Sequence, residues 1–334
     1  MRISFFGKGG SGKTSLSSLF IKFLNEKGKN VLAVDADINV NLGTCLGMDT
    51  KFIGDSFDEI SNFLEPQNLD CKKTKGFFRN LVRNFKSNAC SIKPVIGTTP
   101  PTNKSRFIRP DLKDEFFQKF ATFKGDNLAL LTVGTYTDKK VGYACYHSKL
   151  GSAVLIYNRL LDDKDFFVVS DATAGIDSVG TSMFFVSDIN IFVVEPTNKS
   201  IGVYKDFKEI TKNYPIKTFV IGNKVRNDED MNFIKNEVGS ENILGFVSDS
   251  EHLREYEKGD KTGIDKFVDE NKIINEKIFD LLLNTPKSWD KYYDILKQVY
   301  IDDCGDWYSQ YYGEDLTKYI DKDFSYEEVI KNYV

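Results

Sequence analysis

The chain has 334 residues, of which 41% are hydrophobic and 28% are charged, and its formal net charge is −4. These fractions are ordinary for a folded globular protein, and the length allows a large core in one or two domains. The small negative charge gives no support to binding of nucleic acid or of an anionic membrane surface. No apolar run reaches the roughly 18 residues that a membrane span requires.

The cysteines and the N-terminal residues bear on the compartment. Five cysteines are an odd number without a paired framework, which favours a reducing environment. The short apolar run of residues 1–6 leads directly into a glycine-rich loop, so we expect no signal peptide. The sequence therefore predicts a cytoplasmic protein.

The first motif is this glycine-rich loop, which lies between a predicted strand and a predicted helix. Residues 7–14 read Gly-Lys-Gly-Gly-Ser-Gly-Lys-Thr. From Ser15 to Lys27 apolar residues recur at helical spacing, and Gly28 ends the pattern. Strand, glycine loop, Lys-Thr and helix in this order form the phosphate-binding P-loop in the context that it requires.

Each part of the P-loop has a physical task in holding phosphate. The glycines let backbone N–H groups turn towards phosphate oxygens, and the helix N-terminus adds the positive end of its dipole. We expect the Lys13 ammonium to reach the β- and γ-phosphates and the Thr14 hydroxyl to bind Mg²⁺. The loop residues predicted to contact the nucleotide are Gly9, Gly10, Ser11, Gly12, Lys13, Thr14 and Ser15.

The loop carries a second lysine, Lys8, directly before two glycines. In this it resembles the deviant Walker A loop of the MinD/ParA, nitrogenase iron protein and arsenite-pump ATPases. The resemblance implies an ATP-dependent homodimer in which Lys8 acts in trans, on the nucleotide of the partner subunit. The alternative is that Lys8 is a solvated loop lysine.

A second apolar run, residues 30–37, ends in the carboxylates of Asp35 and Asp37. A strand, helix and strand at this spacing predict an α/β fold: a doubly wound, mainly parallel sheet with helices on both faces and ligands at the strand carboxyl ends. The sequence from Asp35 to Gly43 resembles the first switch of the same ATPases. This implies that Asp37 orients the attacking water, that Asp35 lies near Mg²⁺ and that Asn41 contacts the nucleotide. The alternative for the carboxylates is helix capping.

Residues 50–125 show no strand pattern, and between Cys71 and Pro110 they contain ten Lys or Arg and no Asp or Glu. We interpret this segment as an insertion with a basic surface. The surface is either a solvated cationic face or a docking site for an acidic partner or for phosphate. We do not expect it to bind nucleic acid, because the whole chain is acidic.

A Cys-x-His pair follows the third predicted strand, residues 127–133, and precedes a predicted helix over 150–161. One pair, Cys145 and His147, is too few ligands for a closed metal site. Two copies across a homodimer axis would supply four nitrogen and sulfur ligands, which suits tetrahedral Zn²⁺ or another late transition metal. The alternative is that Cys145 is a small buried hydrophobe and that His147 begins a helix.

Further apolar runs bring the predicted sheet to about seven strands, at residues 163–172, 189–194, 217–224 and 242–247. The run ending at Asp171 continues into Ala-Thr-Ala-Gly175, which resembles the second switch of the same ATPases. The resemblance implies that Asp171 holds Mg²⁺ through water and that the Gly175 N–H senses the γ-phosphate.

Asn223 and Lys224 follow a later strand, in the position where related P-loop proteins face the base. An Asp two residues after the Lys would select guanine, and Arg226 stands there instead. The expected nucleotide is therefore ATP.

Over residues 1–285 the switch strings, the Ala144-Cys145 stretch and the string from Val193 to Ser200 resemble one branch in particular. This branch is the nickel-insertion ATPases that mature carbon monoxide dehydrogenase. Those proteins have Cys-x-Cys where this chain has Cys145-Tyr-His147. The resemblance implies a metallochaperone whose ATP-closed dimer builds or releases a metal site. The alternative is a nucleotide-switched regulator or scaffold of the partition type, without metal.

The last 49 residues differ in composition from the rest. After a predicted helix over 264–283, residues 286–334 hold nine of the sixteen tyrosines, both tryptophans, eleven acidic and six basic residues. We predict a P-loop domain over 1–285 and an acidic, Tyr-rich extension over 286–334, built from short helices that pack on the body or on a partner.

No basic amphipathic helix suggests membrane anchoring. A client protein is expected to dock on the insertion or on this extension.

Overall fold

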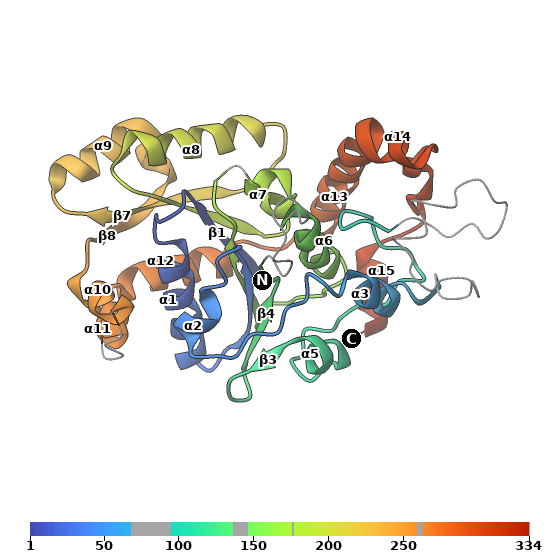
Figure 1. Cartoon of the computed structure of the whole chain (residues 1–334), viewed down its shortest axis with the longest axis horizontal. Helices are drawn as coiled ribbons and strands as arrows, with labels where there is room; N and C mark the ends of the chain where they lie inside the picture. Colours follow the sequence, from blue (N-terminus) through green and yellow to red (C-terminus); the bar gives the residue numbers. More distant parts are fainter. Residues whose placement is uncertain (68–94, 136–145, 176, 259–262, 334) are drawn as a thin grey trace.

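The computed structural model describes residues 1–67, 95–135, 146–175, 177–258 and 263–333. In this part of the chain one sheet of eight strands lies between two layers of helices (Figure 1). The strands are β1 (Arg2–Gly7), β2 (Asn30–Ala36), β3 (Thr122–Phe123), β4 (Leu128–Thr132), β5 (Phe166–Ala172), β6 (Ile189–Val194), β7 (Thr218–Val225) and β8 (Ile243–Ser248).

The strand order across the sheet is β3-β4-β2-β5-β1-β6-β7-β8. Every pair is parallel except β3 with β4, and β1 lies in the middle between β5 and β6. The predicted α/β fold, a doubly wound and mainly parallel sheet, is confirmed. The expected count of about seven strands was short by one. The missing strand is β3, two residues at the sheet edge in a region where the sequence indicated none.

Alternate residues of the central strands face opposite helical layers, as the pleat of a strand requires. Ile3 and Phe5 of β1 pack on one face, and Phe6 packs on the other. The first face is covered by α1 (Lys13–Glu26), α2 (Leu42–Leu46), α11 (Gly263–Glu270) and α12 (Lys272–Leu283). The second face is covered by α3 (Phe57–Leu64), α5 (Glu115–Phe120), α6 (Tyr146–Tyr157), α8 (Asn198–Ile210), α9 (Asp228–Val238), α13 (Trp289–Asp303) and α15 (Tyr326–Tyr333).

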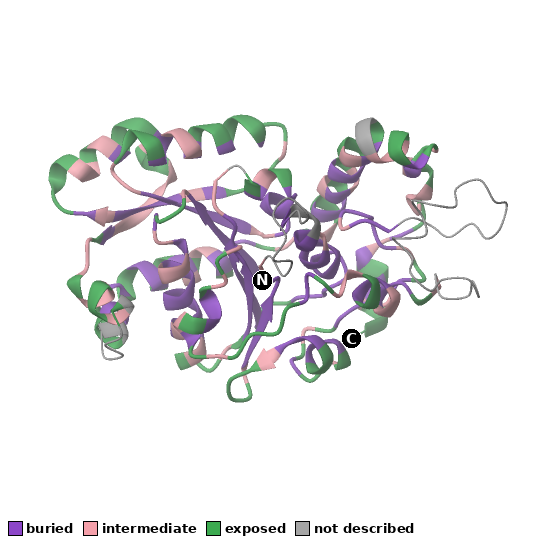
Figure 2. Cartoon of the chain, viewed as in Figure 1, coloured by how far each residue is buried: buried purple, intermediate pink, exposed green. Residues whose placement is uncertain are grey.

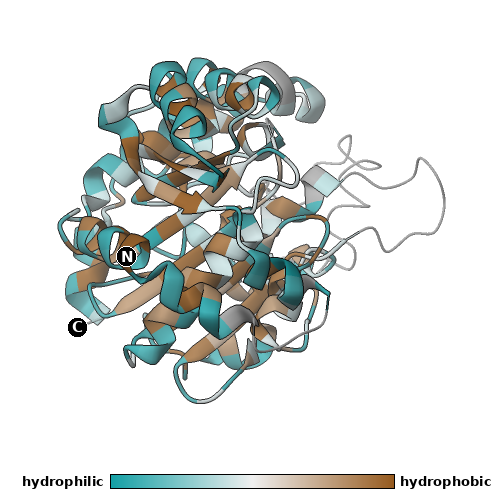
Figure 3. Cartoon of the chain, turned by 90° about the vertical axis from the view of Figure 1, so that its left-hand side faces the viewer, coloured by the Kyte–Doolittle hydropathy of each residue, from teal (hydrophilic) through white to brown (hydrophobic). Residues whose placement is uncertain are grey.

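The remaining helices are short and lie at the ends of these layers. They are α7 (Asp177–Gly180), α10 (Glu251–Glu257) and α14 (Ser309–Tyr312), with 3-10 turns at Met183–Phe185, Ser240–Asn242 and Leu316–Tyr319 and a π-helical turn at Cys304–Tyr308. The central strands are buried and the edge strands β3 and β8 are partly exposed, whereas the helices expose their outer sides (Figure 2). Hydrophobic residues accordingly fill the sheet region, and hydrophilic ones lie on the outer helices (Figure 3). None of the described helices is long and apolar enough to cross a bilayer.

The helix expected over residues 264–283 is two helices, α11 and α12, which meet at Asn271. The side-chain amide of Asn271 donates to the carbonyl of Phe267 at 2.9 Å. A helix would use that carbonyl for the N–H four residues later, so the side chain replaces a helical backbone bond. This local competition was not visible in the hydrophobic pattern, and the single-helix prediction was wrong.

The described parts of the 50–125 segment contribute to the core. Phe107, Phe116 and Phe117 are buried with the second helical layer. The most basic stretch, residues 68–94, lies outside the described residues, so the predicted basic surface stays a prediction there.

The C-terminal helices pack into the same core. Tyr292 and Leu296 of α13 are buried against the body, and Phe324 stacks on Phe107 with ring centroids 5.9 Å apart. Figure 1 shows α13 and α14 rising beside α6 at one end of the sheet.

Candidate functional site

The parallel strands bring the predicted carboxylates together at one edge of the sheet. Asp35 of β2 is in register with Asp171 of β5, and Phe5 of β1 is in register with the same Asp171. Because the carboxyl ends of parallel strands share an edge, the P-loop after β1 lies directly beside these carboxylates.

The P-loop has the backbone geometry that its glycines predicted. Gly10 and Gly12 have φ of 81° and 97°, in the left-handed region that favours glycine. A Cβ on Gly12 would lie 2.1 Å from the side-chain nitrogen of Asn223, so no larger residue fits there. Gly12 caps α1 without any side-chain hydrogen bond, so the first N–H groups of α1 lack the cap that a side chain would provide. Such groups are suited to bind phosphate oxygens.

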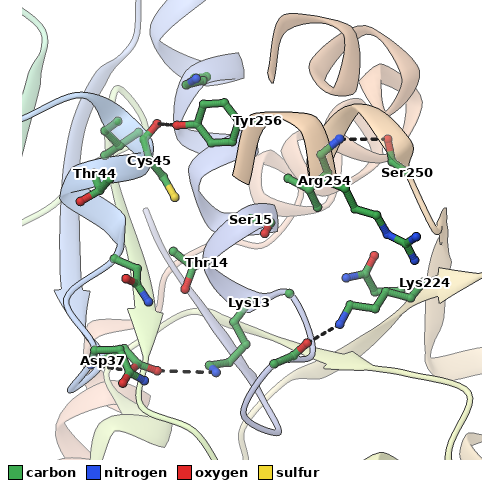
Figure 4. A pocket seen from close by; sticks show the side chains of 18 of the residues that line it. Lys13, Thr14, Ser15, Asp37, Thr44, Cys45, Lys224, Ser250, Arg254 and Tyr256 are labelled. Atoms are coloured by element: carbon green, nitrogen blue, oxygen red, sulfur yellow. Dashed lines mark hydrogen bonds and ion pairs between the residues drawn. The ribbon is translucent and has the colours of Figure 1, made fainter. Parts of the chain in front are cut away.

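Lys13 and Asp37 form an ion pair inside the site. The Lys13 ammonium lies 3.6 Å from a carboxylate oxygen of Asp37, and both side chains are buried (Figure 4). The other Asp37 oxygen accepts hydrogen bonds from the backbone and side chain of Asn39, both at 2.9 Å. The P-loop lysine and the carboxylate predicted to orient water therefore face each other in direct contact.

Thr14 and Asp171 form the second contact between the P-loop and the strand ends. The Thr14 hydroxyl donates to one Asp171 oxygen at 2.6 Å, and the other oxygen of this fully buried carboxylate has no hydrogen-bond partner among the described residues. Burial, and after it the charge of Asp35, raises the pKa of the Asp171 carboxyl to about 8. An unpartnered buried oxygen beside a hydroxyl suits a hard divalent cation with oxygen ligands, so these residues fit Mg²⁺.

The Asp35 carboxylate accepts hydrogen bonds from nearby backbone N–H groups. Its carboxylate accepts the N–H groups of Asp37 at 3.3 Å and of Leu42, the first residue of α2, at 3.0 Å. Burial raises the pKa of Asp35 to about 7, although these hydrogen bonds favour the charged form. The contacts are those of the capping alternative, and they fix the loop that carries Asp37. Its predicted place near Mg²⁺ stays a prediction.

Asn223 and Lys224 bind the P-loop from the end of β7. The Asn223 side chain donates to the carbonyl of Ser11 at 2.8 Å, and the Lys224 ammonium donates to the carbonyl of Gly10 at 2.5 Å. Lys224 has φ of 58°, which is uncommon for a residue with a side chain. The predicted base-facing pair thus also supports the phosphate loop.

A cleft of about 1110 Å³ opens over these residues. It is larger than most pockets for small ligands. Of the residues predicted to contact nucleotide or Mg²⁺ or to orient water, its lining includes Gly9, Gly10, Gly12, Lys13, Thr14, Ser15, Asp37, Asn41, Asn223 and Lys224. Cationic side chains outnumber acidic ones in the lining, so the cleft favours a polyanion: Lys13, Lys22, Lys124, Lys224, Arg226 and Arg254 against Asp37 and Asp249.

Several residues of the cleft were missed by sequence reasoning. Lys22 could have been found, because it lies seven residues after Ser15 and so on the same face of α1. Tyr256 could not, since α10 reaches the cleft only through the tertiary fold. Its hydroxyl donates to the carbonyl of Cys45 at 2.9 Å and joins α10 to α2 across the cleft (Figure 4).

Other predicted residues lie apart from the cleft. The Gly175 N–H, expected to sense the γ-phosphate, donates to the carbonyl of Gly7 at 3.1 Å. The Ser11 hydroxyl is buried and has no hydrogen-bond partner in the part of the chain that the structure describes. Lys8 does not line the cleft, and its ammonium lies 3.7 Å from a carboxylate oxygen of Glu195.

The predicted transition-metal pair cannot be placed. Cys145 and the His147 side chain lie outside the described residues. Elsewhere in the described part of the chain no group of three or more His, Cys, Asp or Glu side chains could hold a metal ion.

Comparison with known proteins adds three findings. The profile of the CobQ/CobB/MinD/ParA nucleotide binding domain matches residues 5–262. An uncharacterized ATP-binding protein of Methanocaldococcus jannaschii is 30% identical over 258 residues, which cover 76% of this chain and 87% of that protein. The carbon monoxide dehydrogenase accessory protein CooC of Rhodospirillum rubrum is 24% identical over 251 residues, 74% of this chain and 83% of that protein.

Among solved structures, a ParA family ATPase from Chlorobium tepidum is similar with a TM-score of 0.52 at 14% identity. The match covers 85% of this chain and 98% of that chain. At this identity the likeness shows the shared fold.

Proposed function

Since the chain belongs to the CobQ/CobB/MinD/ParA nucleotide-binding family, we propose that it is a dimeric switch ATPase that serves the maturation of a metal cofactor in the cytoplasm. It is an ATP-binding member of the MinD/ParA ATPases. The proposal adds slow, Mg²⁺-dependent hydrolysis of ATP, association of two subunits around the nucleotide, and a transition metal as cargo.

The observation that carries the hydrolytic part is the pair of contacts between the P-loop and the strand ends. The Lys13 ammonium lies 3.6 Å from Asp37, and the Thr14 hydroxyl donates to Asp171 at 2.6 Å. Lys13 would hold the transferred phosphate on one side while Asp37 orients a water on the other, and Thr14 and Asp171 would hold Mg²⁺. When bound, Mg²⁺ neutralises charge that develops on the phosphates.

The dimeric part rests on Lys8. This lysine does not line its own cleft, and its side chain is about one third exposed. An ammonium group that lies outside its own nucleotide site would reach phosphates across a subunit interface after leaving its ion pair with Glu195. Charge-assisted hydrogen bonds in such a desolvated contact would favour association in the presence of ATP.

The metal part is supported by the similarity to the carbon monoxide dehydrogenase accessory protein and by the Cys145-Tyr-His147 sequence. One subunit offers two ligands, and a homodimer offers four, which would complete a tetrahedral site for Zn²⁺ or Ni²⁺. ATP and metal would then favour the same closed dimer, so each must raise the affinity for the other by the same factor.

The experiment titrates Zn²⁺, Ni²⁺ and Co²⁺ into protein purified without a polyhistidine tag, with and without a non-hydrolysable ATP analogue. We expect one metal ion per dimer in the wild type, bound more tightly with the analogue. Binding requires an ionised thiol and a neutral imidazole, so the affinity should fall as the pH drops below about 6.5.

Two cysteine variants make the test specific. Cys145→Ser should lose the site, whereas Cys71→Ser, a cysteine without a histidine two residues on, should keep it. Equal, weak binding by the wild type and Cys145→Ser would contradict the metal part. The family membership and the phosphate site would then favour a nucleotide-switched regulator of the partition type.

We place the client surface on the basic insertion or on the C-terminal extension. The extension supports this with three large side chains that remain exposed, Ile301 of α13, Tyr311 of α14 and Tyr333 of α15, at 41%, 55% and 36%. Exposed aromatic and aliphatic side chains of this kind are common anchors of protein interfaces.

A further inference from the structure

The carboxylate of Glu195 lies between two lysines beside the P-loop. One of its oxygens is 3.7 Å from the Lys8 ammonium, and the other accepts a hydrogen bond from the Lys224 ammonium at 2.7 Å. Glu195 is 16% exposed, whereas the two lysines are 35% and 42% exposed. One largely buried carboxylate therefore forms ion pairs with both ammonium groups.

The backbone fixes Glu195 at this position. It directly follows β6, whose Val193 is in register with Gly7 at the end of β1. The two strands meet so closely that a Cβ on Gly7 would lie 2.4 Å from the carbonyl oxygen of Val193. The Glu195 N–H donates to the Ser200 hydroxyl at 3.0 Å, which ties the strand end to α8. The carboxylate is thus held beside the start of the P-loop by strand pairing and by a helix.

Lys224 and Lys8 use this carboxylate differently. Lys224 has a second acceptor, the Gly10 carbonyl at 2.5 Å, and so bridges β7 to the P-loop. Apart from Glu195, the Lys8 ammonium donates only to the carbonyl of Gly9, the adjoining residue, at 3.2 Å among the described contacts. Glu195 is therefore the group that holds the Lys8 ammonium within its own subunit.

We propose that Glu195 is a positioning residue that restrains Lys8 in the separate subunit and competes for it with the phosphates of a nucleotide bound to a partner copy. The inference rests on the proposed function, in which Lys8 acts in trans. A half-exposed ion pair is weak, so a triphosphate in a desolvated interface displaces it. Glu195 then sets the ATP concentration at which two subunits associate.

The first experiment measures the ATP concentration for half-maximal dimerisation by light scattering. It uses an Asp37→Ala background so that hydrolysis does not reverse association. Glu195→Gln should lower this concentration by about two- to five-fold, the range expected when one such ion pair is lost. Glu237→Gln is the matched control, because Glu237 pairs with Lys205 at 2.6 Å on an exposed helix surface away from the cleft.

The Lys8→Ala background separates the release of Lys8 from a direct effect of Glu195→Gln on ATP binding. Removing a negative charge beside the P-loop could by itself tighten ATP binding in the same subunit. In Lys8→Ala protein, which lacks the lysine on which the proposed dimer rests, the direct effect is read from the affinity for a fluorescent ATP analogue; it persists there, whereas the restraint on Lys8 is gone. No shift of the dimerisation midpoint with Glu195→Gln, or a shift equal to the change in ATP affinity that Glu195→Gln causes in Lys8→Ala protein, would overturn the proposal.

The second experiment reads the contact without relying on dimerisation. A zero-length carbodiimide joins the Lys8 amine to the Glu195 carboxylate as an amide, and the water lost in this step converts the carbodiimide to its urea. Peptide mass spectrometry should find the Lys8–Glu195 amide in nucleotide-free protein and lose it with ATP, while the Lys224–Glu195 amide persists.

The outcomes separate the two proposals. Absence of the Lys8–Glu195 amide without nucleotide, or its persistence in an ATP-bound dimer, contradicts the role of Glu195 alone. Protein that forms the amide but stays monomeric at every ATP concentration contradicts the proposed dimer, and the competition with it.

Discussion

In the proposed reaction Asp37 orients water and does not hold phosphate. It faces Lys13 at 3.6 Å and is fixed by Asn39, whereas backbone groups of the P-loop would hold the phosphates. We expect Asp37→Ala to lower ATP hydrolysis by on the order of 10²-fold or more, because water positioning is lost. The affinity for ATP should remain. Phosphate release and binding of a fluorescent ATP analogue measure the two quantities.

Two further variants frame that result. Lys13→Ala should lose both hydrolysis and tight binding, since its ammonium would contact the phosphates themselves. Glu59→Ala, in an exposed pair with Lys119, should change neither. Full turnover by Asp37→Ala would remove Asp37 from this role.

At the residue scale the sequence predicts what is local. The P-loop contacts and Asp37 sit in short motifs whose spacing already implies their geometry, and most of them do line the cleft. Glu195 was seen only as part of a family string, because its link to Lys8 joins residues 187 positions apart. Tyr256 reaches Cys45 over a similar separation, and no periodicity marks such contacts.

At the element scale the buried strands were the most predictable. A strand covered on both faces is a continuous apolar run, and the run of residues 189–194 has the bounds of β6. The edge strand β3 has two residues and is partly exposed, so it leaves no such run. A strand that is buried on both faces, such as β6, can therefore be predicted from its hydrophobic run. A short edge strand such as β3 cannot, because pairing at a sheet edge requires no such run.

A buried ion-pair cluster attaches the start of α13 to the sheet. The Asp162 carboxylate accepts from Arg2 of β1 and from Lys287, both at 2.6 Å; the side chains of Asp162 and Arg2 are fully buried, and that of Lys287 is 11% exposed. Burial alone would raise the pKa of Asp162, but the charges of Arg2 and Lys287 hold it well below its usual range. Losing one member leaves buried charges uncompensated.

We therefore expect Asp162→Asn to lower the free energy of unfolding by about 3–5 kcal/mol at pH 7. Because the folded-state pKa is depressed, the contribution of this carboxylate is present above its unfolded pKa of about 3.9 and is lost as the pH falls below that value. The difference in the free energy of unfolding between wild type and Asp162→Asn, measured by urea unfolding, should thus be smaller at pH 3.5 than at pH 7.

The neighbouring Asp163 supplies the control for this cluster. It is exposed, so Asp163→Asn should change stability little at either pH. If the loss of unfolding free energy caused by Asp162→Asn is the same at pH 7 and at pH 3.5, the shape of the side chain and not its charge stabilises the cluster.

At the scale of the whole molecule, the boundary proposed at residue 285 is one of composition and crosses a continuous core. Phe107 of the body stacks on Phe324 with ring centroids 5.9 Å apart, and the rings of Phe185 of the body and Tyr292 of α13 have centroids 6.0 Å apart. The buried cluster on this face of the sheet contains residues from both sides of the boundary. Composition separates the two parts, whereas packing joins them.

We accordingly expect residues 286–334 to unfold together with the body. In Trp307→Phe protein, Trp289 is the sole tryptophan and reports on the extension, while far-UV circular dichroism reports mainly on the body. The two denaturation curves should coincide, as a cooperative unit requires. Phe107→Ala should shift both curves together to lower denaturant, because it removes a buried ring that lies between the two parts. The free energy of unfolding should fall by about 3–5 kcal/mol. A Trp289 transition at lower denaturant, or one that Phe107→Ala moves alone, would instead make the extension a separate unit docked on the ATPase body.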